Sequence, residues 1–470
     1  MPGRFLNVFR PLTAIMPEVG QPDRRVGFGE KLLWTALALI VYLVMSEVPL
    51  YGIAKGAGAD PFYYLRVIFA SNRGTLMELG IGPIVTAGLI LQLLAGSGII
   101  NVDFGNDDDK TLFTTATKFF SIVMTLFTAS IYLLGGAYGQ LTIEASAIIF
   151  LQLIAAGLIL MLLDEMVQKG WGIGSGISLF IIAGVAQRIW WSCVAPLGPM
   201  SDGKFLGAIP AFIQSLLSGN GLLSAFHRPQ NLPDMLGFIA TILVFIIVIF
   251  FESVRIEIPI AHERFRGYRA NYPVKLLYAS NIPVILSSAL FANIYLFSQI
   301  LWSNFNQSNQ NFLLNLIGTY NASSREPIGG LVYYVIPPRN LETLTADPLR
   351  ALIYVGIMSV MCIMFARIWI DVGGMGSRTV AKQLMDAGMQ VPGFRRAYQP
   401  LQQLLDRYIP TLTVLGGLIV GVIASLADFL GVFGTGMGVL LSVGILYQLY
   451  QQLAQEQIFE MYPMLRRFAG

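Results

Sequence analysis

Residues 79–94 read LGIGPIVTAGLILQLL, and residues 163–180 read LDEMVQKGWGIGSGISLF. Both stretches lead from closely spaced glycines into an apolar run. An apolar helix of about 20 residues can cross the hydrocarbon core of a membrane, and glycine lets such helices pack closely. The two stretches therefore predict tightly packed helices that are surrounded by lipid.

The whole chain has the composition of an integral membrane protein. Hydrophobic residues make up 55% of its 470 residues and charged residues 12%, and the mean hydropathy is +0.65. A soluble domain carries about 25% charged residues. The net charge of +3 is too small to indicate a nucleic-acid-binding protein.

Few side chains are suited to metals or cofactors. Cys193 and Cys362 lack metal-binding spacing, and both histidines, His227 and His262, fall in hydrophilic stretches. No nucleotide-binding loop of the Gly-x-x-x-x-Gly-Lys type appears either. We therefore expect no cofactor, no metal site and no enzymatic activity.

Ten apolar stretches are candidates for membrane spans, although several are short and would need flanking residues or tilt. Charged residues lie at the edges of these stretches rather than in their middle. The predicted spans cover residues 32–50, 75–94, 119–134, 143–163, 172–194, 236–251, 282–301, 351–370, 410–427 and 429–450.

Loop charges predict the orientation. With the N-terminus in the cytoplasm, cytoplasmic loops and tails carry 21 of the 30 Lys and Arg residues, which fits the positive-inside rule with both termini cytoplasmic. No cleavable signal peptide opens the chain, so we expect the first span to direct insertion. The predicted segments are a cytoplasmic amphipathic stretch (1–31), an N-terminal half (32–195), an external connecting loop (196–235), a C-terminal half (236–455) and a cytoplasmic tail (456–470).

Two predicted cytoplasmic loops, residues 252–275 and 367–407, are rich in arginine and lysine. One interpretation is that these charges only fix the topology. The other is that the loops form a docking surface for a large anionic partner such as ribosomal RNA. The residues alone leave both open.

The segment at about residues 60–72 contains a helical apolar stretch of about ten residues, which is too short to span a membrane. It is either a re-entrant helix at membrane depth or an ordinary amphipathic helix in an external loop. Irregular backbone at membrane depth is tolerated where it is buried in protein or lines a water-filled cavity.

The two sets of five spans resemble each other weakly. Gly80–Val85 in the second span parallels Ser280–Ile285 in the seventh, and Gly172–Ile177 in the fifth parallels Gly434–Val439 in the tenth. Because five is odd, repeated halves would have opposite topology. This inverted arrangement is typical of proteins with a pathway at the midplane.

The helices that would line such a pathway carry no ionisable residue at mid-span. Ion-coupled transporters place such residues there, whereas an apolar constriction gates by excluding water. The pattern favours a flexible polypeptide as the substrate. A secondary transporter remains the alternative, and a structural subunit of a respiratory or biosynthetic complex is a third interpretation. The apolar candidates are Ile81, Val85, Ile177, Ile181, Ile285 and Leu441.

The two opening stretches closely resemble the signature motifs of the SecY family, the central (alpha) subunit of the Sec protein-conducting channel. Residues 255–262 and 289–294 are more similar to archaeal members than to those of the endoplasmic reticulum. The resemblance runs nearly end to end. Further similar motifs lie at Ala70–Thr75, Tyr272–Lys275, Ser280–Leu286, Arg407–Pro410 and Gly434–Leu441.

The resemblance implies an all-α membrane protein with ten transmembrane helices, in two inverted five-helix halves around a central pore. It implies that the six apolar candidates form a pore ring. It also implies that the short segment is a re-entrant plug helix that closes the external side of the pore. The plug residues would be Phe62, Leu65, Arg66, Ile68 and Phe69.

A lateral gate toward lipid is also implied, between spans two and three on one side and seven and eight on the other. Its polar residues would be Thr86, Thr128 and Asn293, with Thr128 in place of the glutamine of many eukaryotic members. Ribosome docking is implied for Arg264, Arg266, Arg395 and Arg396, and an influence on the orientation of inserted segments for Arg66, Arg73 and Asp371.

The implied function is passive conduction of secretory polypeptides across the membrane and lateral insertion of apolar segments into lipid. The implied partners are a gamma (SecE-like) and a beta subunit in a heterotrimer, the ribosome with its nascent chain, signal peptides and transmembrane segments as substrates, and the lipid bilayer. The archaeal character implies a plasma membrane rather than the endoplasmic reticulum.

Overall fold

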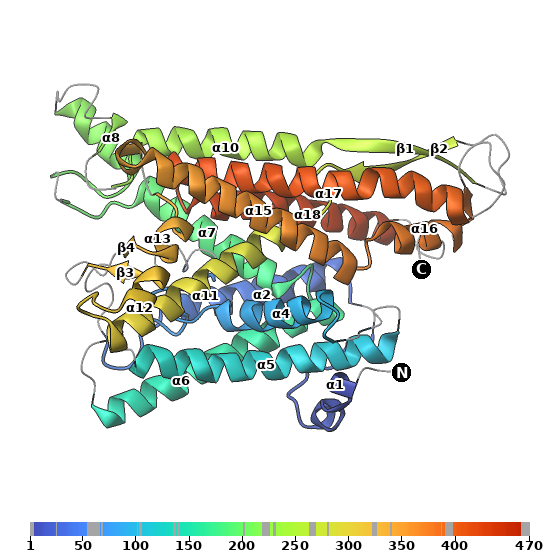
Figure 1. Cartoon of the computed structure of the whole chain (residues 1–470), viewed down its shortest axis with the longest axis horizontal. Helices are drawn as coiled ribbons and strands as arrows, with labels where there is room; N and C mark the ends of the chain where they lie inside the picture. Colours follow the sequence, from blue (N-terminus) through green and yellow to red (C-terminus); the bar gives the residue numbers. More distant parts are fainter. Residues whose placement is uncertain are drawn as a thin grey trace.

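A computed structural model of the chain describes most of it (Figure 1). The described residues are 4–24, 26–53, 66, 69–100, 102, 106–134, 138, 142–200, 203–218, 226–228, 232–262, 269–279, 282–321, 327–338, 341–386, 388–390 and 398–461.

Five helices form the N-terminal half of a bundle. They are α2 (Phe28–Glu47), α4 (Gly82–Gly96), α5 (Asp107–Leu134), α6 (Ile143–Met166) and α7 (Gly176–Val194). Figure 1 shows α5 and α6 along the lower edge, with α4 and α2 above them. Each of the first five predicted spans corresponds to one of these helices.

The C-terminal half contains α10 (Met235–Ser253), α11 (Ile282–Phe305), α15 (Pro348–Val372), α17 (Tyr398–Phe429) and α18 (Gly436–Met461). In Figure 1, α10 lies along the upper edge and α11 lies next to the N-terminal half. Eight of the ten helices are long and apolar enough, over their described residues, to qualify as membrane spans by those criteria alone; α4 and α18 are the other two.

Helix α4 is short, and non-helical residues precede it. Its 15 residues extend about 22 Å, less than the ~30 Å hydrocarbon core. Residues 69–81, which precede it, are not helical but form turns around Gly74 and Gly80, both with positive φ. Non-helical backbone is therefore held against the start of α4.

Several predicted span boundaries were wrong, including the start of α4, which is Gly82 rather than residue 75. Helix α17 begins at Tyr398 rather than at residue 410, because Leu401, Leu405 and Ile409 are buried one turn apart and extend the helix through Pro410. Helix α5 begins at Asp107 rather than 119, and α18 at Gly436 rather than 429. The polar residues at the start of α5 concealed its extra turns in the sequence, and a turn containing Gly431 and Gly434 precedes α18.

The predicted internal repeat has a physical basis at the start of the fifth helix of each half. Asp164, near the end of α6, accepts a hydrogen bond from the Ile177 backbone N–H at 2.9 Å. Asp428, near the end of α17, accepts one from the Gly436 backbone N–H at 2.7 Å. Each carboxylate thus satisfies unpaired donors at a helix N-terminus.

The glycines at these two positions are required by packing. A Cβ at Gly176 would come within 2.5 Å of the Asp164 Cα, and one at Gly436 within 2.5 Å of the Asp428 backbone nitrogen. Such distances are far inside van der Waals contact, so only glycine allows either aspartate to approach its helix. The fifth helix of each half is therefore capped by an aspartate that a glycine allows to come close.

Strands and a helix form at one end of the bundle within the two predicted basic loops. Here β1 (Arg255–His262) and β2 (Arg269–Lys275) form an antiparallel hairpin, and the short strand β5 (Met389–Gln390) pairs with β1 through Ala261 and His262. The 10-residue helix α16 (Ser377–Asp386) lies at the same end (Figure 1). We call this the hairpin end.

Shorter elements complete the two ends. At the hairpin end, α1 (Arg4–Asn7), the 3-10 helix η1 (Arg10–Ala14) and the π-helical turn η2 (Val167–Trp171) lie near α5 and α6. The opposite end carries α8 (Ala208–Leu217), α12 (Phe312–Ile317), α13 (Leu331–Val335), α14 (Leu341–Ala346) and the strand pair β3 (Thr319–Tyr320) and β4 (Pro327–Gly329). Helix α8 falls within the predicted connecting loop 196–235.

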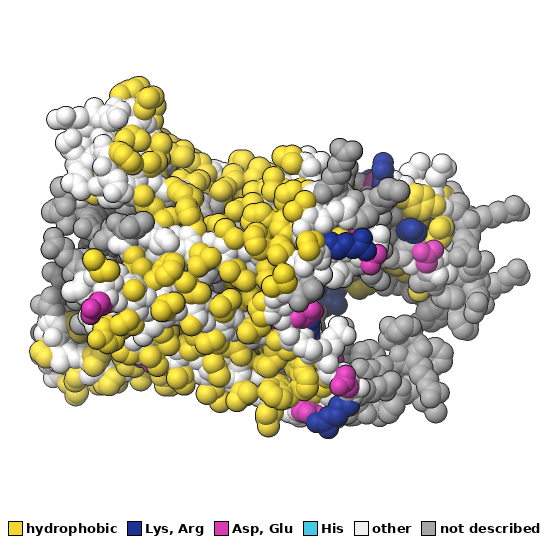
Figure 2. All heavy atoms as spheres, turned by 90° about the horizontal axis from the view of Figure 1, so that it is seen from below, with side chains coloured by type: hydrophobic (Ala, Val, Ile, Leu, Met, Phe, Trp, Pro, Cys, Tyr) yellow, Lys and Arg dark blue, Asp and Glu magenta, His cyan; other side chains and the backbone are white. Residues whose placement is uncertain are grey.

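The outer surface of the bundle is apolar along its middle. Figure 2 shows hydrophobic side chains over most of the central surface, while lysine, arginine and most of the acidic residues gather toward the hairpin end. Exposed apolar residues include Ile246 on α10 and Val360 on α15, at 62% and 64% exposure. A belt of this kind is stable only against lipid.

Candidate functional site

The six residues of the predicted pore ring meet in one buried apolar cluster. Ile81 lies at the N-cap of α4 and Val85 within α4, while Ile177 and Ile181 lie on α7, Ile285 on α11 and Leu441 on α18. Ile81, Ile181 and Leu441 are fully buried. Ile177 and Ile285 are partly buried and pack against the same cluster. Both halves of the bundle therefore contribute to it.

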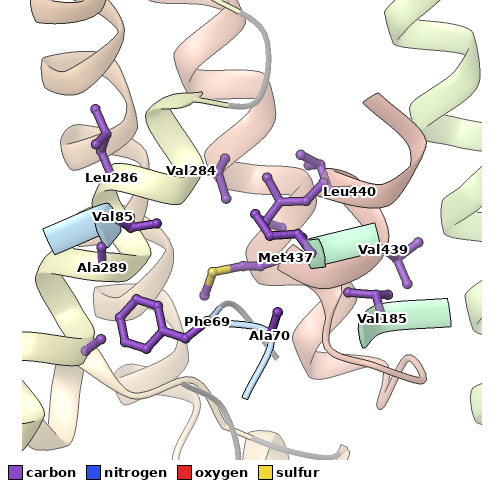
Figure 3. Packing of buried hydrophobic residues seen from close by; sticks show 14 of the residues in the cluster. Phe69, Ala70, Val85, Val185, Val284, Leu286, Ala289, Met437, Val439 and Leu440 are labelled. Carbon is purple, nitrogen blue, oxygen red and sulfur yellow. The ribbon is translucent and has the colours of Figure 1, made fainter. Parts of the chain in front are cut away.

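Figure 3 shows the surroundings of this cluster. The side chains of Val85, Val284 and Met437 converge between α4, α11 and α18, and Phe69 and Ala70 lie on one side of them. The contacting groups are branched aliphatic side chains, a thioether and an aromatic ring.

A large cavity of about 960 Å³ lies on the hairpin side of the cluster. Val85, Ile177 and Ile285 form part of its apolar lining, and Thr13, Met16 and Glu18 of the N-terminal segment line another part. The cavity is wide enough for many water molecules, since one water occupies about 30 Å³. It contacts three of the six predicted ring residues.

The N-terminal segment is tied down beside this cavity. Lys169 on η2 forms ion pairs with Glu18 and, at 2.9 Å, with Glu165, and the Trp171 indole N–H donates to the Gly20 carbonyl at 2.8 Å. The hydrogen bond from Lys169 holds the pKa of Glu18 below its usual range, so this carboxyl stays ionised at neutral pH.

The opposite side of the cluster is covered by residues 66 and 69–71. The Ile81 backbone N–H donates to the Phe69 carbonyl at 2.7 Å, and the Tyr42 hydroxyl donates to the Ala70 carbonyl at 3.0 Å. Arg188 on α7 donates to the Ser71 carbonyl at 2.7 Å. Of the predicted plug residues, Arg66 and Phe69 are placed here. Phe62, Leu65 and Ile68 lie outside the described residues.

The three predicted gate residues line one small cavity of about 20 Å³ between α4, α5 and α11. The Asn293 side-chain amide donates to the Thr86 hydroxyl at 3.2 Å and to the Ala289 carbonyl at 2.7 Å. The Thr128 hydroxyl instead donates to the Met124 carbonyl of its own helix at 2.7 Å. Thr86 and Asn293 thus join α4 to α11 directly, while Thr128 only lines the cavity.

The other predicted charges are distributed over the molecule. Arg66 is buried beside the gate cavity, whereas Asp371 is exposed at the end of α15; Arg73 lies in the turn before α4. Arg264, Arg266, Arg395 and Arg396 lie outside the described residues. Their flanking segments are described, and the pairing of β5 with β1 brings the two basic loops together.

The roles of several residues at this site were not predicted from the sequence. Glu78 pairs with Arg66, Arg188 anchors residue 71, and Asp164 and Asp428 cap helices. Their sequence signal was present but ambiguous, because charges at the edges of apolar stretches are usual in membrane proteins. Only the folded contacts distinguish them from charges that face water.

Comparison with known proteins identifies the family. The SecY family model matches residues 75–450, and the plug domain of Sec61p matches residues 40–74. The chain belongs to the SecY family. The expected fold class, ten helices with a plug segment, is confirmed by this assignment.

Relatives of the SecY family cover the chain almost completely. It is 46% identical over 467 residues to the protein translocase subunit SecY of Pyrococcus horikoshii, covering 96% of each chain. It is 44% identical over 468 residues to the protein transport protein Sec61 subunit alpha of Dictyostelium discoideum, covering 97% of each. The resemblance to archaeal members of the family is thereby confirmed.

Solved structures of SecY-like channels share the fold. A protein-conducting channel superposes with a TM-score of 0.83 at 37% identity, covering 97% of this chain and 98% of the other. Sec61 in the canine ribosome–channel complex from the endoplasmic reticulum gives 0.81 at 36% identity, with the same coverage. The protein is thus a multi-pass membrane protein with the fold of a protein-conducting channel.

Proposed function

We propose that this chain is the central subunit of a protein translocation channel and conducts polypeptides passively. The observation that carries the proposal is the arrangement along one path: a large cavity, then an apolar cluster, then residues 66 and 69–71. A moving polypeptide presents varied side chains, and branched apolar groups can give way around it without binding any of them. The channel itself performs no chemistry.

The constriction also accounts for a sealed resting state. Water and ions leave a narrow apolar passage because no polar partner replaces their hydration. Phe69 and Ala70 add a second barrier on the far side, which supports the proposed plug role of residues 60–72. A secondary transporter would need polar groups for a solute and a coupling ion at this point, so the apolar cluster disfavours that alternative.

We infer that the seam between α4 and α5 on one side and α11 and α15 on the other is the lateral gate. Its closing contact is the hydrogen bond between Thr86 and Asn293, supported by packing of the Phe127 and Phe297 rings with centroids 6.2 Å apart. One neutral hydrogen bond contributes only about 1 kcal/mol net. Transfer of an apolar segment into lipid is favourable by ~0.8 kcal/mol per buried CH₂. This free energy is enough to open a seam that is held by such a contact.

The gate assignment is tested by bridging Thr86→Cys and Asn293→Cys with a short bis-maleimide, which alkylates one thiol at each end. We expect the bridged channel to lose insertion of apolar segments into lipid, because the seam can no longer separate. Each single-cysteine variant treated with the same reagent is the control and should insert normally. Normal insertion through the bridged channel would contradict the assignment of the lateral gate to this seam.

We propose the hairpin end as the cytoplasmic side and as the ribosome-docking surface. The pairing of β1, β2 and β5 places the two basic loops next to each other, so that they can form a single docking surface. A similar structure is a ribosome–channel complex, which supports this partner. By family membership we also propose gamma and beta subunits as partners, signal peptides and transmembrane segments as substrates, cytoplasmic termini and an archaeal plasma membrane.

Reversing two charges tests the docking surface. We expect Arg266→Glu with Arg395→Glu to weaken ribosome co-sedimentation strongly at low salt and less at high salt, because screening shortens the range of the attraction to ~10 Å at 0.1 M. The control is Arg10→Glu with Arg24→Glu, which changes the net charge by the same amount at two exposed arginines outside the two basic loops. Equal binding of the wild type and the double variant would contradict the assignment.

A further inference from the structure

The chain segment before α2 forms part of the wall of the large cavity. Its lining residues there are Thr13, Met16, Glu18 and Gln21. Three residues of the predicted pore ring, one each from α4, α7 and α11, line the same cavity. A polypeptide that approaches the ring from the hairpin end therefore crosses a space that the N-terminal segment borders.

The start of this segment is anchored in an apolar cluster. Leu6 and Phe9 are 0% and 6% exposed. The cluster that buries them also contains Leu91 of α4 and Leu112 and Ala116 of α5. Because removing large apolar side chains from water is favourable, these contacts fix α1 and η1 to α4 and α5.

A second anchor lies further along the segment. Glu18 forms an ion pair with Lys169 on η2. The Gly20 carbonyl accepts a hydrogen bond from the Trp171 indole N–H at 2.8 Å. The Trp171 ring packs against Trp34 of α2 at an interplanar angle of 70°, with ring centroids 5.4 Å apart. The chain between the two anchors is therefore held at both ends beside the cavity.

Thr13 and Met16 lie between these anchors, and both are partly buried. The Thr13 hydroxyl donates to the Arg10 carbonyl at 2.7 Å, so its donor is already satisfied. The Met16 side chain is unbranched, and its thioether adapts to irregular apolar partners. Their neighbour Ile15 is 78% exposed. Thr13 and Met16 thus line the cavity with groups that require no particular partner.

The adjoining wall, formed by α5, has the same character. Thr114, Thr117 and Ser121 line the cavity. Each of these hydroxyls donates to the carbonyl four residues earlier in α5, at 2.9, 2.9 and 2.7 Å respectively. A hydroxyl whose donor is used within its own helix holds a passing group only weakly. A chain of varied sequence can therefore move along this wall.

We propose that the N-terminal segment is a fixed wall of the polypeptide path, and that Thr13 and Met16 contact a chain entering from the hairpin end. This rests on the proposed function, because it takes the large cavity as part of the path. The partner is an unfolded polypeptide in transit. Its apolar side chains pack against the flexible Met16 thioether, and its polar groups stay in the water that fills the cavity.

Photocrosslinking tests the contact in the full channel with its partner subunits. A polypeptide is arrested during translocation, and a photoreactive residue is placed at Thr13, Met16, Ile15 or Val85 in turn. We expect capture of the arrested chain from Thr13 and Met16, as from Val85 in the cavity lining. Capture from the exposed Ile15 should be several-fold weaker, because only a segment held in one orientation distinguishes these neighbours.

A variant of the second anchor tests how the wall is held. Glu18→Lys with Trp171→Phe removes the ion pair and the indole donor but keeps an aromatic ring. We expect capture from Met16 to fall several-fold in this variant, while capture from Val85 stays unchanged. Asp23→Lys makes the same charge change at an exposed position of the segment and should leave both captures unchanged. Undiminished capture from Met16 in the anchor variant would overturn the anchoring.

Two further results would overturn the proposal in distinguishable ways. If Val85 captures the arrested chain but Thr13 and Met16 do not, or if Ile15 captures it as strongly as Met16, the N-terminal wall is wrong while the path stands. If Val85 captures nothing either, the path through this cavity is wrong and the wall fails with it.

Discussion

Replacement of Ile81, Val85 and Ile285 by asparagine is expected to raise the resting ion conductance of reconstituted channels on the order of tenfold or more. The three side chains come from the N-cap of α4, from α4 and from α11, and they belong to or pack against the apolar cluster between the large cavity and residues 69–71. Amide groups would hydrogen-bond water inside the constriction, so the passage would stay wet. Single-channel recording in planar bilayers measures the effect.

The matched control keeps the constriction apolar. Substituting leucine at Ile81 and Ile285 changes shape but not polarity, and cores tolerate such volume-conserving exchanges at under ~1.5 kcal/mol. Conductance should stay at the resting value in this variant. Unchanged conductance in the asparagine variant would show that the barrier to ions lies elsewhere.

Substitution of Asp428 by alanine is expected to destabilise the folded channel by about 2–3 kcal/mol. Its carboxylate is 2% exposed and accepts from the Gly436 backbone N–H at 2.7 Å and from the Tyr354 hydroxyl at 3.4 Å. Alanine leaves both donors buried without this acceptor. The midpoint of thermal unfolding in detergent, followed by tryptophan fluorescence, should fall clearly.

The repeat supplies a second site for the same experiment. Asp164→Ala removes the equivalent contact with α7 and should lower the midpoint by a similar amount. Asp371→Asn, an exposed position at the end of α15, should leave it unchanged. Equal midpoints for Asp428→Ala and the wild type would contradict the capping role assigned to both aspartates.

The sequence predicted the helices well where apolar length decides the structure. Ten apolar stretches correspond to ten helices because a span in lipid satisfies its own backbone and needs little tertiary information. Boundaries were less predictable. Residues 398–409 continue α17 only because Leu401 and Leu405 are buried against neighbouring elements at the hairpin end, which composition alone does not reveal.

The hairpin end was the largest omission. Isoleucine at positions 256, 258 and 260 alternates with other residues, which is typical of a strand, but the stretch was interpreted through its charge and its resemblance to archaeal members rather than as a strand. Pairing with β5 depends on a segment more than 120 residues away and has no local signal. The structure therefore adds the arrangement of the two basic loops, which the sequence did not predict.

The candidate site was predicted unevenly. The resemblance to the SecY family implied that six apolar residues form one ring, and the structure places these residues in or against one apolar cluster. Partner choice among polar residues was not predictable. Thr128 donates to its own helix, whereas Thr86 reaches Asn293, and a hydroxyl on a helix has both options.

The most direct measurement is site-specific photocrosslinking from Ile81, Ile181 and Leu441 to a polypeptide arrested during translocation. A photoreactive residue at each position should capture the arrested chain, while one at lipid-facing Ile246 on α10 should capture lipid. Capture at all three positions is the predicted result. An arrested chain that crosses the membrane without labelling any of them would contradict a path through this cluster.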